Sequence, residues 1–367
     1  MRSPSPHFHT FFAFFALLLA GGVAVHEAPA DELKPVTVRV TSGTKSVLGR
    51  PVEYTDSQFI MLRRDGRMIL YNMGNVDEVD KVSSYFTPYS SLKLQEHYRK
   101  LFGDSYEVSR TAHYVVVHPR GMRQRWAEPF EQLYNRFTQY FSVRGYTLKR
   151  TEFPMVVVVF NTRDEFNRVA DKDGLGNPNS YAGYYSPTSN WIVTCHEAGQ
   201  QAGDWESNAT LIHEALHQYA FNTGIHQRWA PTPKWCAEGL ASMFEARGVN
   251  NSSRFTSASD RQHEYYVPYL RNVVEQNAYA GVLRSLVASD RLYDENMTLA
   301  YATSWGLAWY LSETRPLEFN QYLQRIAARD RLLPYNSSDR LADFARSFGT
   351  DFSLLESHFR DYVKQSR

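Results

Sequence analysis

Residues 208–245 constrain this chain most, because they contain a His-Glu-x-x-His pattern formed by His213, Glu214 and His217. Residues four apart on a helix lie one turn apart on the same face, so the two imidazoles can hold one metal ion between them. Glu214 lies beside them, where its carboxylate can take a proton from a water molecule that the metal polarises. Hydrolysis by zinc requires this division of roles.

The residues around this pattern predict that it lies on a helix. Ser207 or Asn208 can cap the start, Gly224 can end it, and no proline interrupts it. Two other His-Glu pairs, His196-Glu197 and His263-Glu264, lack a histidine at the right offset and predict ordinary polar residues at the surface or in the core. A buried histidine is more often a core residue than a ligand, so the metal site needs further support. Six apolar residues recur with the helical period: Leu211, Ile212, Ala215, Leu216, Tyr219 and Ala220.

That support comes from Glu238, because a catalytic zinc usually takes three protein ligands and the pattern supplies two. Glu238 lies in an apolar-periodic run after Pro231 and Pro233, which predicts a second helix packed against the first. The intervening loop, residues 224–233, is long enough to reverse the chain. We therefore expect Glu238 to converge with the two histidines on one metal ion.

The two predicted helices resemble those of the gluzincin zinc peptidases, in which a His-Glu-x-x-His helix is followed by a Trp-x-x-Glu-Gly-x-Ala helix. The similarity is greatest to a bacterial branch of peptidase-MA-like proteins whose first helix reads His-Glu-Ala-x-His-Gln. It covers roughly Thr111 to the C-terminus and is specific around the two helices. It implies one Zn²⁺ ion held by His213, His217 and Glu238. Glu214 is then the general base.

The same resemblance implies a tyrosine that donates a hydrogen bond to the substrate's carbonyl oxygen as negative charge develops there. In aminopeptidase-type gluzincins this tyrosine starts a helix some sixty residues after the glutamate ligand, and Tyr301 has that placement. Such a donor is typically worth about 3 kcal/mol. Tyr265, Tyr266 and His263 are competing donors, and a buried structural aromatic is the alternative role of Tyr301.

Two departures from the family limit what the resemblance implies. No Gly-x-Met-x-Asn motif, which holds the substrate's free amine in aminopeptidases, precedes the metal helix, so exopeptidase action is not expected. Ser242 stands one turn after the third ligand, where thermolysin-like enzymes have an aspartate that orients a histidine ligand. That support must then come from another residue, and Glu245 is the candidate.

Residues 1–30 are expected to be a signal peptide rather than part of the fold. Arg2 gives a weakly positive start, residues 11–25 are an apolar run too short for a comfortable membrane span, and residues 28–30 fit a cleavage site. The mature chain is then exported, to the periplasm or the extracellular space, with no stable membrane span. An uncleaved segment would instead anchor the N-terminus.

Residues 31–90 predict a small β domain that resembles an SH3-like barrel. An Arg-Asp-Gly-Arg turn at residues 64–67 predicts a hairpin between its third and fourth strands. The domain either caps the next one structurally or recruits a substrate or partner. Five short apolar runs alternate with glycine-containing turns: 36–40, 46–48, 58–62, 68–71 and 79–82.

The catalytic domain is predicted over residues 111–367, after a linker helix within residues 91–110. Its fold class is α+β, and the resemblance implies a thermolysin-like or gluzincin-like domain with a mixed sheet and an α-rich lower lobe. The first part alternates strands at 112–118 and 155–160 with helices at 123–141 and 163–169. Helical patterns then predominate: 261–277, 279–288, 299–313, 316–329, 340–347 and 352–364.

A hairpin of residues 181–185 and 191–195 is predicted just before the metal helix. In gluzincins the strand at this place is a sheet edge that pairs with an extended peptide. The resemblance therefore implies that one of these two strands binds substrate through its backbone. A plain edge hairpin without a ligand is the alternative.

The chain has two cysteines, Cys195 at the end of this hairpin and Cys236 two residues before Glu238. In an exported protein a pair of cysteines more often forms a disulfide than stays reduced. A bridge would tie the hairpin to the helix of the third ligand, and two separate thiols are the alternative. Zinc ligation by Cys236 is the alternative to zinc ligation by Glu238, and Glu238 is the better supported of the two.

The charge balance argues against a nucleic-acid partner, because the net charge is +1 and no block of lysine or arginine stands out. The sequence therefore predicts an exported zinc-dependent peptidase, an endopeptidase, that acts on peptide or protein substrates. A catalytically degenerate peptidase fold that serves as a binding or scaffold protein of the cell envelope is the alternative. Hydrolysis of a non-peptide amide, such as a cell-wall crosslink, is compatible with the same motifs.

Overall fold

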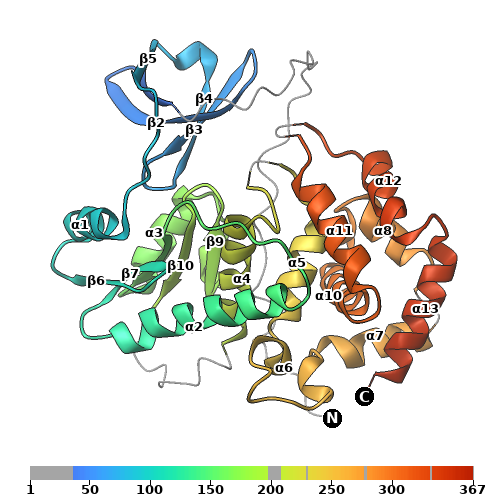
Figure 1. Ribbon diagram of the computed structural model, residues 1–367. Coiled ribbons are helices and arrows are strands. Elements are labelled where there is room, and N and C mark those ends of the chain that lie inside the picture. The colour runs from blue at the N-terminus through green and yellow to red at the C-terminus, as the bar shows by residue number, and fades with distance from the viewer. Residues whose placement is uncertain (1–35, 197–207, 229, 277–278, 331–332, 367) are drawn as a thin grey trace. The chain divides into compact units, whose positions relative to one another are not determined.

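The structure is a computed structural model that describes residues 36–196, 208–228, 230–276, 279–330 and 333–366 (Figure 1). It is a mixed α+β protein with two five-stranded sheets. The chain divides into two compact units, which are Met1–Glu128 with Thr151–Ala198, and Pro129–Arg150 with Gly199–Arg367. Both sheets belong to the first unit, and helices build the described part of the second. The predicted signal peptide lies outside the described residues.

The strands are β1 (Thr37–Ser42), β2 (Lys45–Tyr54), β3 (Gln58–Arg63), β4 (Met68–Asn72), β5 (Glu78–Ser83), β6 (Tyr106–Arg110), β7 (Tyr114–Pro119), β8 (Met155–Phe160), β9 (Gly183–Ser186) and β10 (Trp191–Cys195). The first helices are α1 (Ser91–Phe102), α2 (Arg123–Ser142), α3 (Arg163–Lys172), α4 (Ala209–Thr223), α5 (Lys234–Met243) and α6 (Arg247–Asn250). The remaining helices are α7 (Tyr266–Glu275), α8 (Val282–Ala288), α9 (Leu292–Glu295), α10 (Met297–Thr314), α11 (Pro316–Ala327), α12 (Ser337–Phe348) and α13 (Phe352–Gln365). The described residues also contain the short 3-10 helices η1 (Met73–Asn75), η2 (Pro178–Ser180) and η4 (Ser259–Arg261).

The N-terminal sheet is antiparallel throughout and has the strand order β4-β3-β2-β1-β5. Each of the five predicted apolar runs lies in one of its strands. The predicted hairpin turn joins β3 to β4, and Gly66 adopts a φ of 84° in the left-handed region that favours glycine. Val38, Val40, Phe59 and Met61 form its core. The predicted strands are thus confirmed, and likeness to an SH3 barrel stays a prediction.

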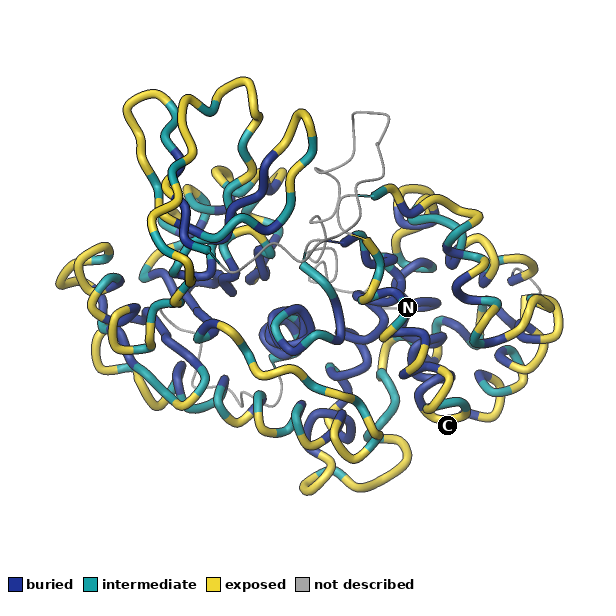
Figure 2. The backbone as a smooth tube through the Cα atoms, turned by 45° about the horizontal axis from the view of Figure 1, so that its top comes forward, coloured by how far each residue is buried: buried dark blue, intermediate teal, exposed yellow. Residues whose placement is uncertain are grey.

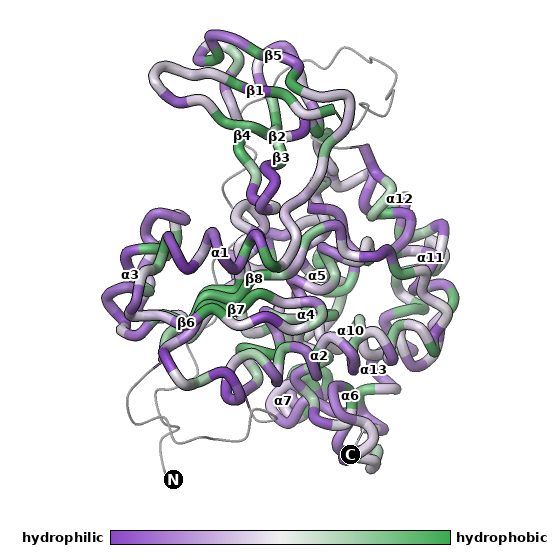
Figure 3. The backbone as a smooth tube through the Cα atoms, turned by 60° about the vertical axis from the view of Figure 1, so that its left-hand side comes forward, coloured by the Kyte–Doolittle hydropathy of each residue, from purple (hydrophilic) through white to green (hydrophobic). Residues whose placement is uncertain are grey.

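The second sheet is mixed, with the order β6-β7-β8-β10-β9. Its three inner strands run parallel, and β6 and β9 pair antiparallel at the two edges. Parallel neighbours need a crossover, which α2 supplies between β7 and β8, and a segment containing α3 supplies between β8 and β10. Strands β7 and β8 are buried along their length and are strongly hydrophobic (Figure 3), as expected for inner strands.

One strand of this sheet was not predicted, and the pairing decides which strand of the predicted hairpin lies at the edge. Strand β6 was not predicted, because Tyr-Glu-Val-Ser-Arg has no apolar run and an edge strand needs only partial burial. In the predicted hairpin, β9 lies at the sheet edge, whereas β10 pairs with both β8 and β9. Of the two strands of this hairpin, β9 is therefore the one at a sheet edge, and its four residues are buried.

Helix α10 is the central helix of the second unit and contacts α5, α7, α8, α9, α11 and α13 (Figure 1). A helix that is apolar all round is expected in such an interior position, and α10 is buried from Ala300 to Ser312. Figure 2 shows that exposed residues gather in turns and on outer helices, whereas inner helices and strands are buried. Within the part of the chain that is described, no helix is long and apolar enough to cross a bilayer.

Most predicted C-terminal helices are present, and the largest shift concerns the first of them. A helix was predicted from residue 261, but α7 starts at Tyr266. Pro268 lies in its first turn, where a missing N–H costs nothing, whereas an earlier start would place this proline in the helix interior. The short helices α6 and α9 were not predicted.

Candidate metal centre

Helix α4 carries the two histidines and has the predicted start and stop. The Asn208 side chain accepts a hydrogen bond from the Leu211 N–H at 3.2 Å, and Gly224 ends the helix with a φ of 84°. The helix is buried on nearly all sides, beyond the single apolar face expected from the sequence. His213 and His217 are therefore held in an interior where few rotamers are open to them.

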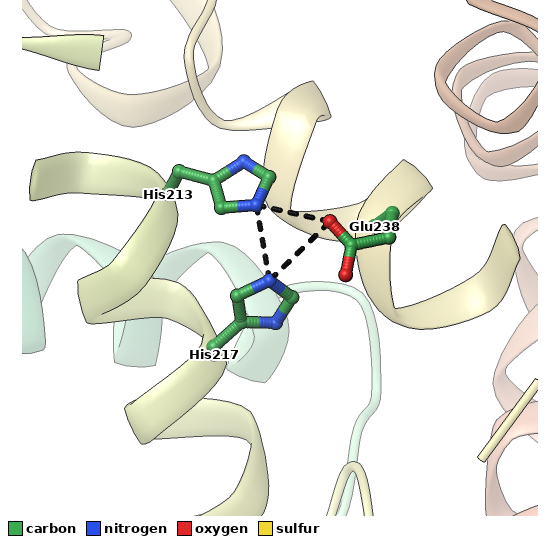
Figure 4. Close-up of side chains that lie close together, drawn as sticks. All are labelled: His213, His217 and Glu238. Carbon is green, nitrogen blue, oxygen red and sulfur yellow. Dashed lines mark hydrogen bonds and ion pairs between the residues drawn. The ribbon is translucent and has the colours of Figure 1, made fainter. Parts of the chain in front are cut away.

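Three side chains from α4 and α5 converge in a buried group (Figure 4). The Nε2 atom of His213 lies 3.0 Å from Nε2 of His217 and 3.2 Å from Oε2 of Glu238. The third side of the triangle, from His217 Nε2 to Glu238 Oε2, is 3.7 Å. Donors about 2.0–2.2 Å from a tetrahedral zinc lie about 3.3–3.6 Å apart, which falls within this range. The group can therefore bind one metal ion.

The charges of the group also favour a cation. Burial opposes the charged form of His213, but hydrogen bonds to Glu238 and Glu245 outweigh burial and raise the His213 pKa well above its ordinary value. Burial likewise opposes ionisation of Glu238, but the charge of His217 and the hydrogen bond from His213 hold the pKa of Glu238 below its ordinary value. The pocket thus stabilises one positive charge, from a proton or from a metal ion.

Gly239 explains why a glycine follows the third ligand. A Cβ at this position would lie 2.2 Å from the backbone oxygen of Ser304 and 3.1 Å from the Ala308 Cβ, so glycine allows α5 to contact α10 closely. The start of α5 is held as well, because the Asp290 Oδ1 accepts the Lys234 N–H at 3.2 Å and Arg340 pairs with that carboxylate at 2.7 Å. The packing of Gly239 on α10 and the hydrogen bond at the start of α5 together position Glu238.

Replacing Gly239 with alanine is expected to lower the free energy of unfolding by about 3 kcal/mol, because the backbone oxygen of Ser304 cannot move aside as a side chain would. Urea denaturation measures this change. Gly176→Ala is the control, since an added Cβ there meets no atom within 4 Å and φ is not positive. Equal stability of the two variants would contradict the proposed packing of α5 on α10.

Glu245 orients the His213 imidazole, as the sequence suggested. Its Oε1 atom lies 2.8 Å from the Nδ1 of His213, and its Oε2 atom lies 3.1 Å from the Nε2 of His263. Burial opposes ionisation of Glu245, but these two hydrogen bonds outweigh burial and lower its pKa to about 2. A carboxylate that accepts the second N–H of a ligand histidine fixes the tautomer and the ring orientation.

The two predicted catalytic residues, Glu214 and Tyr301, lie on α4 and α10. Glu214 is partly exposed, and its oxygens are not members of the group. Tyr301 is buried, and its hydroxyl pKa is raised well above the ordinary value by burial and further by the charges of Glu238 and Glu214. The catalytic role of Tyr301 stays a prediction.

The competing donors fit less well than Tyr301. His263 donates to Glu245, and Tyr265 is 40% exposed. Tyr266 is stacked on His263, with ring centroids 4.0 Å apart. These three side chains are thus either engaged by a neighbour or exposed, and Tyr301 stays the predicted donor.

The sequence analysis missed two histidines near the group. His263 was interpreted as an ordinary polar residue, yet it contacts Glu245. His226 lies two residues after the glycine that ends α4 and is 2% exposed. Burial, together with the charge of His217, lowers the His226 pKa to about 3 and keeps its imidazole neutral. A histidine two residues after the terminal glycine of the metal helix was the available signal.

The two cysteines, both of which the structure describes, do not form a disulfide. Cys236 is buried, and burial raises its thiol pKa well above the ordinary value, so the thiolate that zinc requires is disfavoured. Its sulfur also lies outside the group of His213, His217 and Glu238. The structure therefore favours Glu238 over Cys236 as the third ligand.

A family model described as "Protein of unknown function (DUF1570)" matches residues 207–332. The matched stretch contains α4, α5, α7 and α10, and with them every side chain of the candidate metal centre. A search of curated proteins finds no match to the chain.

Proposed function

We propose that the protein is a zinc-dependent peptidase of the gluzincin type, acting as an endopeptidase after export of the chain. The observation that carries the proposal is the convergence of two histidines of α4 and Glu238 of α5, with Glu214 adjacent in sequence to a ligand. Two neutral imidazoles and one carboxylate are a usual ligand set of catalytic zinc, which leaves a fourth position for water or substrate.

The residues of the chain divide the work of peptide hydrolysis among them. A Zn²⁺ ion, when bound, supplies Lewis acidity towards the scissile carbonyl and lowers the pKa of water. Glu214 accepts the proton of the attacking water and passes it to the leaving amine nitrogen, and its partial exposure suits contact with both. The Tyr301 hydroxyl donates to the carbonyl oxygen as charge develops, and its raised pKa keeps the proton in place.

The absence of an exopeptidase motif from the sequence supports endopeptidase action. A sheet edge pairs with a substrate backbone irrespective of its side chains. The resemblance assigns this pairing to one strand of the β9–β10 hairpin, of which β9 lies at the sheet edge. The substrates we propose are therefore extended peptides and unfolded proteins.

Metal removal tests the proposal directly. The mature chain, residues 31–367, is expected to hold one zinc ion and to cleave an unfolded protein substrate internally. Dialysis against a chelator should reduce hydrolysis to the level that trace metal supports, and stoichiometric Zn²⁺ should restore it, because the ligands are placed before metal binds. Mass spectrometry of the products and of the metal content gives both readings.

Two results would contradict the proposal. Hydrolysis that persists undiminished in metal-free protein would remove the metal from the mechanism. A fully zinc-loaded protein that cleaves no member of a broad peptide library would favour the alternative, a binding or scaffold protein with a peptidase fold.

A further inference from the structure

His263 is bound at both ring nitrogens, which defines its tautomer. Its Nδ1 atom lies 3.3 Å from the backbone N of Tyr265 and 3.3 Å from that of Tyr266, at the start of α7. Backbone N–H groups only donate, so Nδ1 accepts, and the proton of the neutral imidazole resides on Nε2. Nε2 therefore donates to Oε2 of Glu245 at 3.1 Å.

Glu245 in turn holds an imidazole on each oxygen. One oxygen accepts the Nδ1–H of His213 at 2.8 Å, and the other accepts the Nε2–H of His263. Glu245 follows the last turn of α5, beyond Met243, so the regular helix does not fix the direction of its side chain. Contacts from outside α5 must then keep the carboxylate turned towards His213.

The His263 ring is itself held between two helices. It stacks on Tyr266 of α7 with centroids 4.0 Å apart and an angle of 22° between the planes. The Trp305 ring of α10 contacts it at a centroid distance of 6.0 Å and an angle of 65°. Only 13% of the His263 side chain is exposed. A ring held in this way can fix the position of the carboxylate that it contacts.

We propose that His263 is a positioning residue of the metal centre, which acts on the ligand His213 through Glu245. By holding Glu245 in place, it keeps the Nδ1 of His213 occupied and leaves the Nε2 of His213 directed at Glu238. The proposal extends the proposed function and depends on it only in requiring that a metal binds to this group. His263 also connects the start of α7 to the ligand set, so a loss of helical structure at the start of α7 is expected to lower metal affinity as well.

Two substitutions separate the two contacts of the His263 ring. In His263→Asn the amide oxygen lies near the position of Nδ1 and can still cap α7, but no donor reaches Glu245. In His263→Gln the amide N–H lies near the position of Nε2 and can still donate to Glu245. We expect His263→Asn to weaken Zn²⁺ binding about 10–100-fold and His263→Gln to recover most of that loss.

The experiment measures metal affinity in the mature chain, with Zn²⁺ and Co²⁺ as probes. Competition with a chromophoric chelator gives Kd, and the visible absorption of the Co²⁺ form reports the geometry around His213. A double-mutant cycle adds Glu245→Ala. If His263 acts through Glu245, His263→Asn changes Kd by less than about twofold once Glu245 is absent.

The outcomes of this experiment distinguish failure of the positioning role of His263 from failure of the proposed function. A Kd for His263→Asn equal to that of wild type would overturn the positioning role and leave the proposed function intact. The same holds if the effects of His263→Asn and Glu245→Ala on Kd simply add in the double variant. Wild-type protein that binds neither ion at this group would overturn both. Failure to hydrolyse peptides bears on the proposed function alone, because affinity and the Co²⁺ spectrum are measured without substrate.

Discussion

Glu214→Gln is expected to lower the rate of peptide hydrolysis about 10²–10⁴-fold while metal content stays at one ion per chain. The amide has the shape of the carboxylate but cannot accept the proton of the attacking water. The ligand set does not include Glu214, so the affinity of the site for metal should change little. The loss should fall on kcat, because the proton moves in the chemical step rather than in substrate binding.

Glu264→Gln is the matched control for this experiment. It removes the same charge from an exposed position next to His263, and it should leave the rate unchanged. Metal analysis of both variants separates a lost base from a lost ion. A Glu214→Gln variant that keeps its zinc and cleaves at the wild-type rate would eliminate the proposed mechanism.

The two helices of the metal centre were predictable because their signals are local. Asn208 and Gly224 bound α4, and Pro233 marks the start of α5, so helix periodicity could place the histidines and Glu238 on defined faces. The convergence of the three side chains followed from the spacing and from the number of ligands that zinc takes. The structure confirms that this group is buried and compact.

The surroundings of the ligands were less predictable because they depend on tertiary contacts. Glu245 and His263 are 18 residues apart, and no local period shows that they meet. Pairing with Glu245 gives His263 its place in the site, whereas the sequence showed only an isolated His-Glu pair. The close approach of α10 to Gly239 depends equally on packing, although the glycine itself was visible.

Strands were predictable in proportion to their burial. β8, a run of four valines between Met155 and Phe160, has the predicted bounds, because a strand buried on both faces has an uninterrupted apolar sequence. β6 has polar residues at alternate positions and one open side, so its sequence resembles that of a loop. The same reasoning explains why the choice between β9 and β10 as the edge strand required the observed pairing.

Glu238→Ala is expected to weaken zinc binding by about two orders of magnitude. Apparent zinc binding energies of about 10–16 kcal/mol in four-ligand structural sites correspond to about 3 kcal/mol per ligand, or about 10²-fold in Kd. The loss should be enlarged further, because Glu238 is the carboxylate of this buried group and offsets the charge of the metal ion. Competition with a chelator measures the change.

Cys236→Ala separates this prediction from its rival, since Cys236 lies on the same helix and is equally buried. With Glu238 as the ligand, Cys236→Ala leaves zinc affinity near that of wild type, and its cost is confined to folding stability because a buried side chain is shortened. The Co²⁺ form would distinguish the two cases further, because thiolate ligation gives an intense near-ultraviolet charge-transfer band that oxygen ligation lacks. Tight zinc binding that survives in Glu238→Ala but disappears in Cys236→Ala would move the third ligand to sulfur and remove the gluzincin assignment.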